Sequence, residues 1–193
     1  MPETYFENKT YKDKDFTVSP LPKGEYEHCS FVNCNFSNCN FGAFQFTNCN
    51  FEACNLSLIK LSKTSLQTVN FKDCKMIGIH FEQCNPISLE LDFQNCNLSN
   101  SSFYQLKLKE TVFNNSNLQE CDFTGSDFSM AVFDACDLLN AHFENTVLEK
   151  ADFRTAHNFH INPEENRLKG AKFSLSGLPG LLGKYSIEID FKS

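Results

Sequence analysis

The chain has 193 residues, a formal net charge of −7 and a sequence pI near 5.2. This acidity disfavours direct electrostatic binding to nucleic acid or to anionic lipid. No apolar run approaches the roughly 18 residues that a membrane-spanning helix needs. The first residues, MPETYFENKTYKDKDF, lack the apolar core of a signal peptide. We therefore expect a cytoplasmic protein with no membrane contact and no direct contact with nucleic acid.

Residues 1–25 are predicted to form an N-terminal cap. Tyr11 and Phe16 share the five-residue spacing of large apolar residues that governs the rest of the chain, and the breaker-rich stretch SPLPKG follows them. An open end of a repetitive fold needs such a cap, because it would otherwise expose apolar rings and strand edges. We expect the segment to join the first coil only in part.

Residues 26–158 repeat with a period of five. Of 27 successive positions at this spacing, 25 are Phe, Tyr, Leu or Met, and each of the ten cysteines stands two residues before such a centre. At the other sites of that class Ala, Ser, Thr and Val predominate. A period of five fits neither a helix nor a simple strand. It fits a solenoid in which each coil has four sides of five residues.

A four-sided coil must also repeat every 20 residues, and the sequence does so across a two-residue shift at Leu89 and Glu90. Residues 20 positions apart form columns along the solenoid, and one such column contains a single Phe with Leu and Met. The cysteines are interpreted as small buried residues, since thiols without a secretory signal stay reduced and their spacing is not that of zinc ligands. One column is entirely phenylalanine and is the expected core ladder: Phe31, Phe51, Phe71, Phe93, Phe113, Phe133 and Phe153.

The recurring triplets CNF, CDF and ADF resemble the A(D/N)LXX motif of the pentapeptide-repeat family over about residues 26–158. The resemblance implies an all-β fold, a right-handed quadrilateral parallel β-helix. Two features depart from the motif: Phe44 occupies a small-residue slot, and Pro86 with the nearby insertion interrupts the phase. We expect a bulge or loop around residues 86–91 that divides the rod into two stacks.

Residues 159–193 are predicted to form a last partial coil, a helix from about Leu178 to Lys184, and a strand with a period of two. The apolar face of that strand could fold back on its own chain. We expect instead that it forms a homodimer, as the resemblance to gyrase-interacting proteins of the Qnr and MfpA type implies; the segment INPEENR and the tail also resemble McbG. The expected dimerisation residues are Leu178, Leu181, Leu182, Tyr185, Ile187, Ile189 and Phe191.

Acidic residues concentrate in residues 110–153. This segment contains nine carboxylates and one cation, Lys150, and has a formal charge of −8. Such a surface could compete for a basic DNA-binding site. Alternatively, these carboxylates bond local backbone N–H groups, and they fall on all four sides of the coil, which marks out no single face. The candidate partner-binding residues are Glu120, Asp122, Asp127, Asp134, Asp137, Glu144, Glu149 and Asp152.

No catalytic or nucleotide-binding motif is present, and the five histidines are scattered. We expect no enzymatic activity, no cofactor and no metal. The resemblance implies an acidic DNA mimic that binds DNA gyrase or topoisomerase IV and protects it from quinolones or a peptide toxin. The alternative is a pentapeptide-repeat scaffold or protein-interaction module of unrelated role. The insertion of only two residues argues against a full Qnr equivalent, since several Qnr proteins carry longer loops that contribute to protection.

Overall fold

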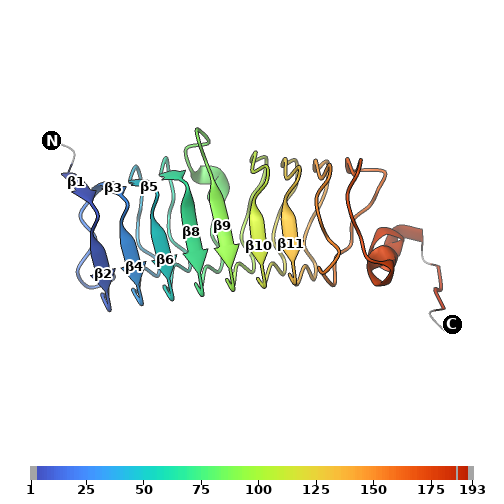
Figure 1. Ribbon diagram of the computed structural model, residues 1–193, viewed down its shortest axis with the longest axis horizontal. Helices are drawn as coiled ribbons and strands as arrows, with labels where there is room; N and C mark the ends of the chain where they lie inside the picture. The colour runs from blue at the N-terminus through green and yellow to red at the C-terminus, as the bar shows by residue number, and fades with distance from the viewer. Residues whose placement is uncertain (1–3, 186, 191–193) are drawn as a thin grey trace.

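The computed structural model describes residues 4–185 and 187–190, which form coils stacked along one axis (Figure 1). Short parallel strands make two sheets on this rod. The first sheet contains β2 (Thr10–Lys12), β4 (Ser30–Val32), β6 (Asn50–Glu52), β8 (Val69–Lys72), β9 (Leu91–Gln94), β10 (Val112–Asn114) and β11 (Val132–Asp134). The second contains β1 (Thr4–Glu7), β3 (Gly24–Glu27), β5 (Gln45–Thr47) and β7 (Ser65–Gln67).

Strand register confirms the four-sided solenoid. Phe31 pairs with Phe51, 20 residues on, and Phe71 pairs with Phe93 across the insertion. Side 1 of each coil carries the first sheet and side 4 the second. Side 2 is centred on Phe36, Leu56, Met76, Leu98, Leu118 and Leu138, and its coils are joined by isolated parallel bridges. Side 3, joined in the same way, is centred on Phe41, Leu61, Phe81, Phe103, Phe123 and Phe143.

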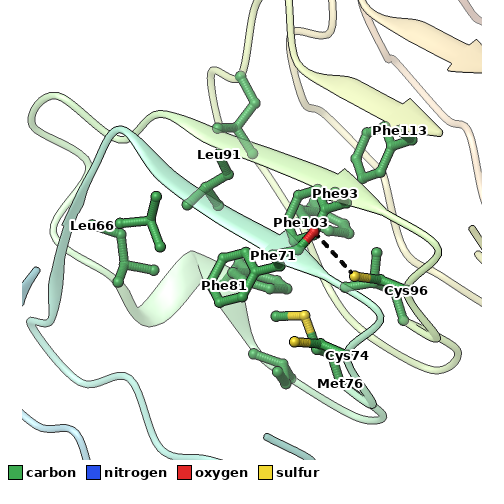
Figure 2. Packing of buried hydrophobic residues seen from close by; sticks show 14 of the residues in the cluster. Leu66, Phe71, Cys74, Met76, Phe81, Leu91, Phe93, Cys96, Phe103 and Phe113 are labelled. Atoms are coloured by element: carbon green, nitrogen blue, oxygen red, sulfur yellow. Dashed lines mark hydrogen bonds between the residues drawn. The ribbon is translucent and has the colours of Figure 1, made fainter. Parts of the chain in front are cut away.

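The phenylalanines of side 1 stack ring on ring through the rod. Their centroids lie 4.6 Å apart between Phe31 and Phe51 and 5.4 Å apart between Phe71 and Phe93, with nearly parallel planes. Tyr11 extends the stack at one end. Figure 2 shows this stack beside the rings of side 3. Each coil thus buries the same kind of side chain above its equivalent, so the core is continuous along the rod.

The position two residues before a centre, which we call the slot, often holds a side chain that donates a hydrogen bond to the preceding coil. The Cys74 thiol lies 3.3 Å from the Phe51 carbonyl oxygen of the preceding coil, and Cys96 lies 3.4 Å from that of Phe71 (Figure 2). Where the slot holds Thr64 or Thr146, the hydroxyl donates to the equivalent carbonyl. A thiol or hydroxyl in this slot therefore adds a hydrogen bond to the preceding coil that alanine could not make.

The buried thiols of Cys49 and Cys136 are neutral and remain hydrogen-bond donors. All ten cysteines are free, and nine of them are buried. Burial raises the pKa of the Cys49 and Cys136 thiols to about 12. Cysteine in this fold is consequently a structural residue that packs and donates a weak hydrogen bond.

The corners of the coil use left-handed backbone. The residue two positions after a centre has positive φ at nearly every corner described, for example Asn33 at 52°, Asn115 at 47° and Gly125 at 68°. Asn, Asp and Gly tolerate this region better than other residues. Their frequency at these positions in the sequence follows from the geometry of the turn.

Gly125→Ala is expected to lower the free energy of unfolding by about 1 kcal/mol. The added Cβ would sit at positive φ and 3.1 Å from the Gln105 Cγ atom. The reverse change at another exposed corner, Ala53→Gly, where φ is 53°, should stabilise slightly or leave stability unchanged. Urea unfolding measures both; a Gly125→Ala variant as stable as the wild type would contradict the strain assigned to the corner.

The insertion forms a loop over residues 84–90, between the 3₁₀ turn η1 (Phe81–Gln83) and β9. It takes the place of side 4 in its coil, with Pro86 and Ile87 exposed, and the second sheet ends at β7. On side 1, however, β8 pairs directly with β9. The expectation of two separate stacks is therefore wrong on side 1. The loop at side 4 accommodates the two extra residues, and the register of strand pairing resumes on side 1 of the next coil.

The first coil begins at residue 4. Strands β1 and β2 pair with β3 and β4, and Phe6 and Tyr11 stack on Tyr26 and Phe31. The five-residue spacing therefore extends through residues 6, 11, 16 and 21, ahead of residue 26. Residues 17–23 form the irregular part of this coil.

The end of the repeat slips by one residue. Asn158, which stands at the expected centre, is exposed with φ of 59°, whereas Phe159 is buried. The partial coil then returns, and Phe173 stacks on Phe153 with centroids 5.3 Å apart. The C-terminal segment therefore packs against Phe159.

The C-terminal segment is 3₁₀ rather than α-helical, comprising η2 (Leu175–Leu181) and η3 (Gly183–Tyr185). With three residues per turn, Gly177, Gly180 and Gly183 share one face. A Cβ on Gly180 would lie 2.4 Å from the Phe159 carbonyl oxygen, and one on Gly183 would lie 2.7 Å from His160 Nδ1. Glycine at this spacing lets the segment pack closely against the end of its own rod.

The expected strand after this segment is wrong for the described residues. Tyr185 ends η3, and residues 187–190 are irregular. The expected dimerisation residue Phe191 lies outside the described residues. Lys184 and the Tyr185 hydroxyl both contact the Glu164 carboxylate. Leu178, Tyr185 and Ile187 are exposed, Leu182 and Ile189 are half-buried, and Leu181 packs against the core of its own chain.

Candidate partner-binding surface

The acidic coils hold their carboxylates on every side, but the charge excess is not equal on each. Side 4 of residues 106–150 carries Glu110, Asp127 and Glu149 together with three lysines, so its formal charge is zero. Sides 2 and 3 lie next to each other along the chain. Their residues 96–105, 116–125 and 136–145 contain four acids, no lysine and no arginine. Those four acids are Glu120, Asp122, Asp137 and Glu144.

The aspartates that precede a centre each accept a hydrogen bond from a backbone N–H two residues on. Asp122 accepts from Thr124 at 2.9 Å, Asp127 from Ser129 at 3.0 Å and Asp137 from Leu139 at 3.1 Å. Asn97 and Asn117 make the same bond. This local bond fixes the turn of the coil, so the position of each aspartate has a structural cause whether or not it binds a partner.

Ion pairs between coils neutralise part of the acidity. Asp127 lies 3.3 Å from the Lys109 ammonium, and Glu149 lies 2.6 Å from the Arg167 guanidinium. Asp152 contacts Arg154 at 2.7 Å and Lys172 at 3.8 Å. These partners lie on sides 1 and 4 of the rod.

The remaining candidates have no lysine or arginine partner among the described residues. Asp134 accepts from Thr155 and Asn114. Asp137 accepts from Gln119 and Asn158, with His157 3.9 Å away. Asp122 accepts only its local backbone bond, and no side-chain bond or ion pair joins Glu120 or Glu144 to the described part of the chain; both of these glutamates are exposed. Sides 2 and 3 therefore carry four carboxylates that no lysine or arginine of the described residues neutralises, and these define the acidic surface.

Three of the candidate aspartates have a lowered pKa. The Arg154 side chain lowers the pKa of Asp152. Burial raises the pKa of Asp127 and Asp137, but hydrogen bonds outweigh burial, so the pKa of each is lowered. Asp127 accepts these bonds from Ser129. Asp137 accepts them from Asn158 and Gln119. Each of these carboxylates is charged in the folded protein at neutral pH.

We expect stability to fall as the pH is lowered below about 4. A lowered native pKa means that the unfolded chain binds the proton more tightly, so the stabilisation is present above the unfolded pKa and is lost as the pH falls through the folded one. Asp152→Asn should flatten this dependence in urea unfolding between about pH 5 and pH 3. An unchanged pH slope in that variant would contradict the role given to the Asp152–Arg154 pair.

Sequence reasoning found the acids but missed their partners. Lys109 precedes Asp127 by 18 residues, Arg167 follows Glu149 by 18, and Lys172 follows Asp152 by 20. A 20-residue coil places such residues side by side on neighbouring coils. A search for opposite charges at 18 to 20 residues, rather than a sum over each segment, would have found which acids are neutralised.

The chain offers little for other kinds of site. Within residues 4–185 and 187–190 no three His, Cys, Asp or Glu residues are grouped as a metal ion requires, and no helix there is long and apolar enough to cross a bilayer. A cleft of about 460 Å³ lies between side 3 and the C-terminal segment, bordered by His142, Glu144, His160 and Lys184. His142 and His160 do not form a ligand-like group with a carboxylate of the described chain.

The fold and the repeat define a class of protein, the β-solenoids built from five-residue units. The family model of the pentapeptide repeat region matches residues 25–103 and 96–173. This chain belongs to the pentapeptide-repeat family.

Two solved structures of similar fold are variants of a quinolone-resistance protein. A trypsin-treated variant of QnrB1, described as a plasmid-mediated fluoroquinolone resistance protein, superposes with a TM-score of 0.76 at 18% identity, over 97% of this chain and 92% of that one. A second trypsin-treated QnrB1 variant gives 0.63 at 15% identity, over 97% and 98%. At these identities the likeness shows the fold. No curated protein matches the chain.

Proposed function

We propose that this protein is a non-enzymatic rod whose acidic surface on sides 2 and 3 binds the DNA-binding surface of DNA gyrase or topoisomerase IV. By occupying that surface it would protect the enzyme from a quinolone or a peptide toxin. The proposal places the protein in the cytoplasm, where its partner acts on DNA.

One observation carries the proposal: two adjacent sides present four carboxylates on two neighbouring coils, and residues 96–105, 116–125 and 136–145 contain no lysine or arginine. A protein surface that binds DNA is basic and attracts an acidic partner over long range. The backbone beneath these carboxylates is held by hydrogen bonds between coils, such as Asp122 N–H to the Ser101 carbonyl at 3.0 Å. A rigid array of charges loses little conformational entropy when it binds.

The proposal includes a homodimer joined at the C-terminal ends. Leu178, Tyr185 and Ile187 are exposed on the C-terminal segment while its glycine face packs on the rod. A two-fold axis through this apolar surface would bury it against its equivalent. The acidic coils of both copies would then flank the centre of a longer rod.

The similarity to QnrB1 supports the proposal at the level of fold and overall extent. The two chains cover nearly all of each other, and QnrB1 is named as a fluoroquinolone resistance protein. The sequence identity of 18% does not carry the function across by itself. The acidic surface is the independent support.

The test is a DNA supercoiling assay with purified gyrase and the protein titrated in, with and without a quinolone. The proposal expects drug-inhibited supercoiling to recover at low protein concentration and supercoiling to be inhibited at high concentration. Folded protein that changes neither supercoiling nor drug sensitivity would overturn it for gyrase, and the same assay with topoisomerase IV would decide for that enzyme. Failure with both would leave a scaffold or interaction module of another role.

A further inference from the structure

The first coil differs from the later coils in the slot that precedes each centre. On sides 1 and 2 of the second coil this slot holds Cys29 and Cys34, both buried. The residues 20 positions earlier are Lys9 and Lys14, and both are exposed. Register places them in equivalent positions, since Tyr11 pairs with Phe31 and Asp15 bridges Asn35. Two charged residues thus stand where the later coils have uncharged ones.

Slot side chains face toward the preceding coil. The thiols of Cys29 and Cys34 each lie 3.5 Å from a carbonyl oxygen of the first coil, that of Phe6 or Tyr11. For Lys9 and Lys14 the described residues contain no preceding coil, because β1 and β2 are the outermost strands of their sheets. The two lysines therefore stand on the outermost coil of the described rod, which is called its N-terminal end below.

This end has the features that favour addition of another chain. Strands β1 and β2 each have one edge without a neighbouring strand in the described structure. Phe6 and Tyr11 are only half-buried, since each ring is covered by the next coil on one face. Unpaired strand edges beside exposed apolar rings are a template for pairing with a second copy.

We propose that Lys9 and Lys14 act as gatekeepers that prevent a second copy of this chain from docking on the N-terminal end of the rod. A docked copy would enclose both ammonium groups in slots that elsewhere hold buried thiols. Burying a charge without a partner is strongly unfavourable, and lysine on an edge is a recurrent device against such pairing. Self-association is thereby restricted to other surfaces.

The test compares molar mass in solution by sedimentation velocity across a hundredfold range of protein concentration. The double variant Lys9→Ala, Lys14→Ala should show a rise in weight-average mass of about twofold or more over the wild type as concentration increases. The matched control Lys60→Ala, Lys75→Ala removes the same charge from exposed lysines on the flanks of the rod and should behave as the wild type. Lys9→Arg, Lys14→Arg should also remain at the wild-type mass.

Circular dichroism establishes that each variant is folded before its mass is compared. A folded Lys9→Ala, Lys14→Ala variant with the wild-type mass throughout the range would overturn the proposal. So would equal association of the flank control, which would attribute the effect to net charge. The comparison of each variant with the wild type isolates the N-terminal end from association elsewhere on the rod, and it does not depend on whether gyrase is the partner.

Discussion

Phe123→Ala is expected to lower the free energy of unfolding by about 3–5 kcal/mol. Phe123 is fully buried on side 3, where its ring stacks between Phe103 at 5.2 Å and Phe143 at 4.8 Å with planes within 6°. It also meets the rings of Phe128 and Phe133 edge-on. Removing one ring from a close-packed column leaves a cavity that rigid coils above and below cannot close. Urea unfolding of the variant measures the loss.

The control for this change is Tyr104→Ala, the neighbour of Phe103 on the same side. Tyr104 is 41% exposed, and its ring takes no part in the stack. We expect it to change stability by less than about 0.5 kcal/mol. A Phe123→Ala variant no less stable than Tyr104→Ala would contradict the stacked core as the source of stability.

Neutralising the acids of sides 2 and 3 is expected to weaken gyrase binding by about tenfold or more, equivalent to about 1.4 kcal/mol or more. The variant combines Glu120→Gln, Asp122→Asn, Asp137→Asn and Glu144→Gln. Amide side chains keep an oxygen that can accept the local backbone bonds of Asp122 and Asp137. The fold should persist while four charges are lost from the acidic surface. Titration of gyrase against labelled protein gives the affinity.

Its matched control removes four charges from sides 1 and 4 through Glu110→Gln, Asp127→Asn, Asp134→Asn and Glu149→Gln. Two of these acids are already paired, Asp127 with Lys109 and Glu149 with Arg167. We expect the control to weaken binding by less than about threefold. Equal losses in the two variants would show that net charge alone matters and would remove the acidic face from the account.

Much of the fold could be predicted because one constraint repeats. A coil of 20 residues must bury the same kind of side chain at each turn, so the spacing of Phe31, Phe51 and Phe71 alone reveals the register of the coils. The break in this spacing also predicts the insertion near Pro86. The spacing does not predict that the first sheet continues past the insertion, since that depends on which side of the coil accommodates the extra residues.

The parts that escaped prediction depend on contacts outside the repeat. The alternation from Tyr185 to Phe191 predicts a strand, whereas residues 187–190 are irregular in the described structure. The packing role of the glycines at 177, 180 and 183 could not be predicted, because their close approach to Phe159 and His160 depends on a one-residue slip at Asn158. For the candidate surface, a sum of charges along the chain hid the pairing between coils.

The most direct test of the account is competition between this protein and duplex DNA for purified gyrase. Labelled duplex bound to the enzyme is titrated with the unlabelled protein, and the fluorescence anisotropy of the DNA is followed. The account predicts that the wild type displaces the duplex and that the variant neutralised on sides 2 and 3 does so far less well. Folded wild-type protein that leaves the duplex bound at every concentration would contradict the claim that its acidic face occupies a DNA-binding surface.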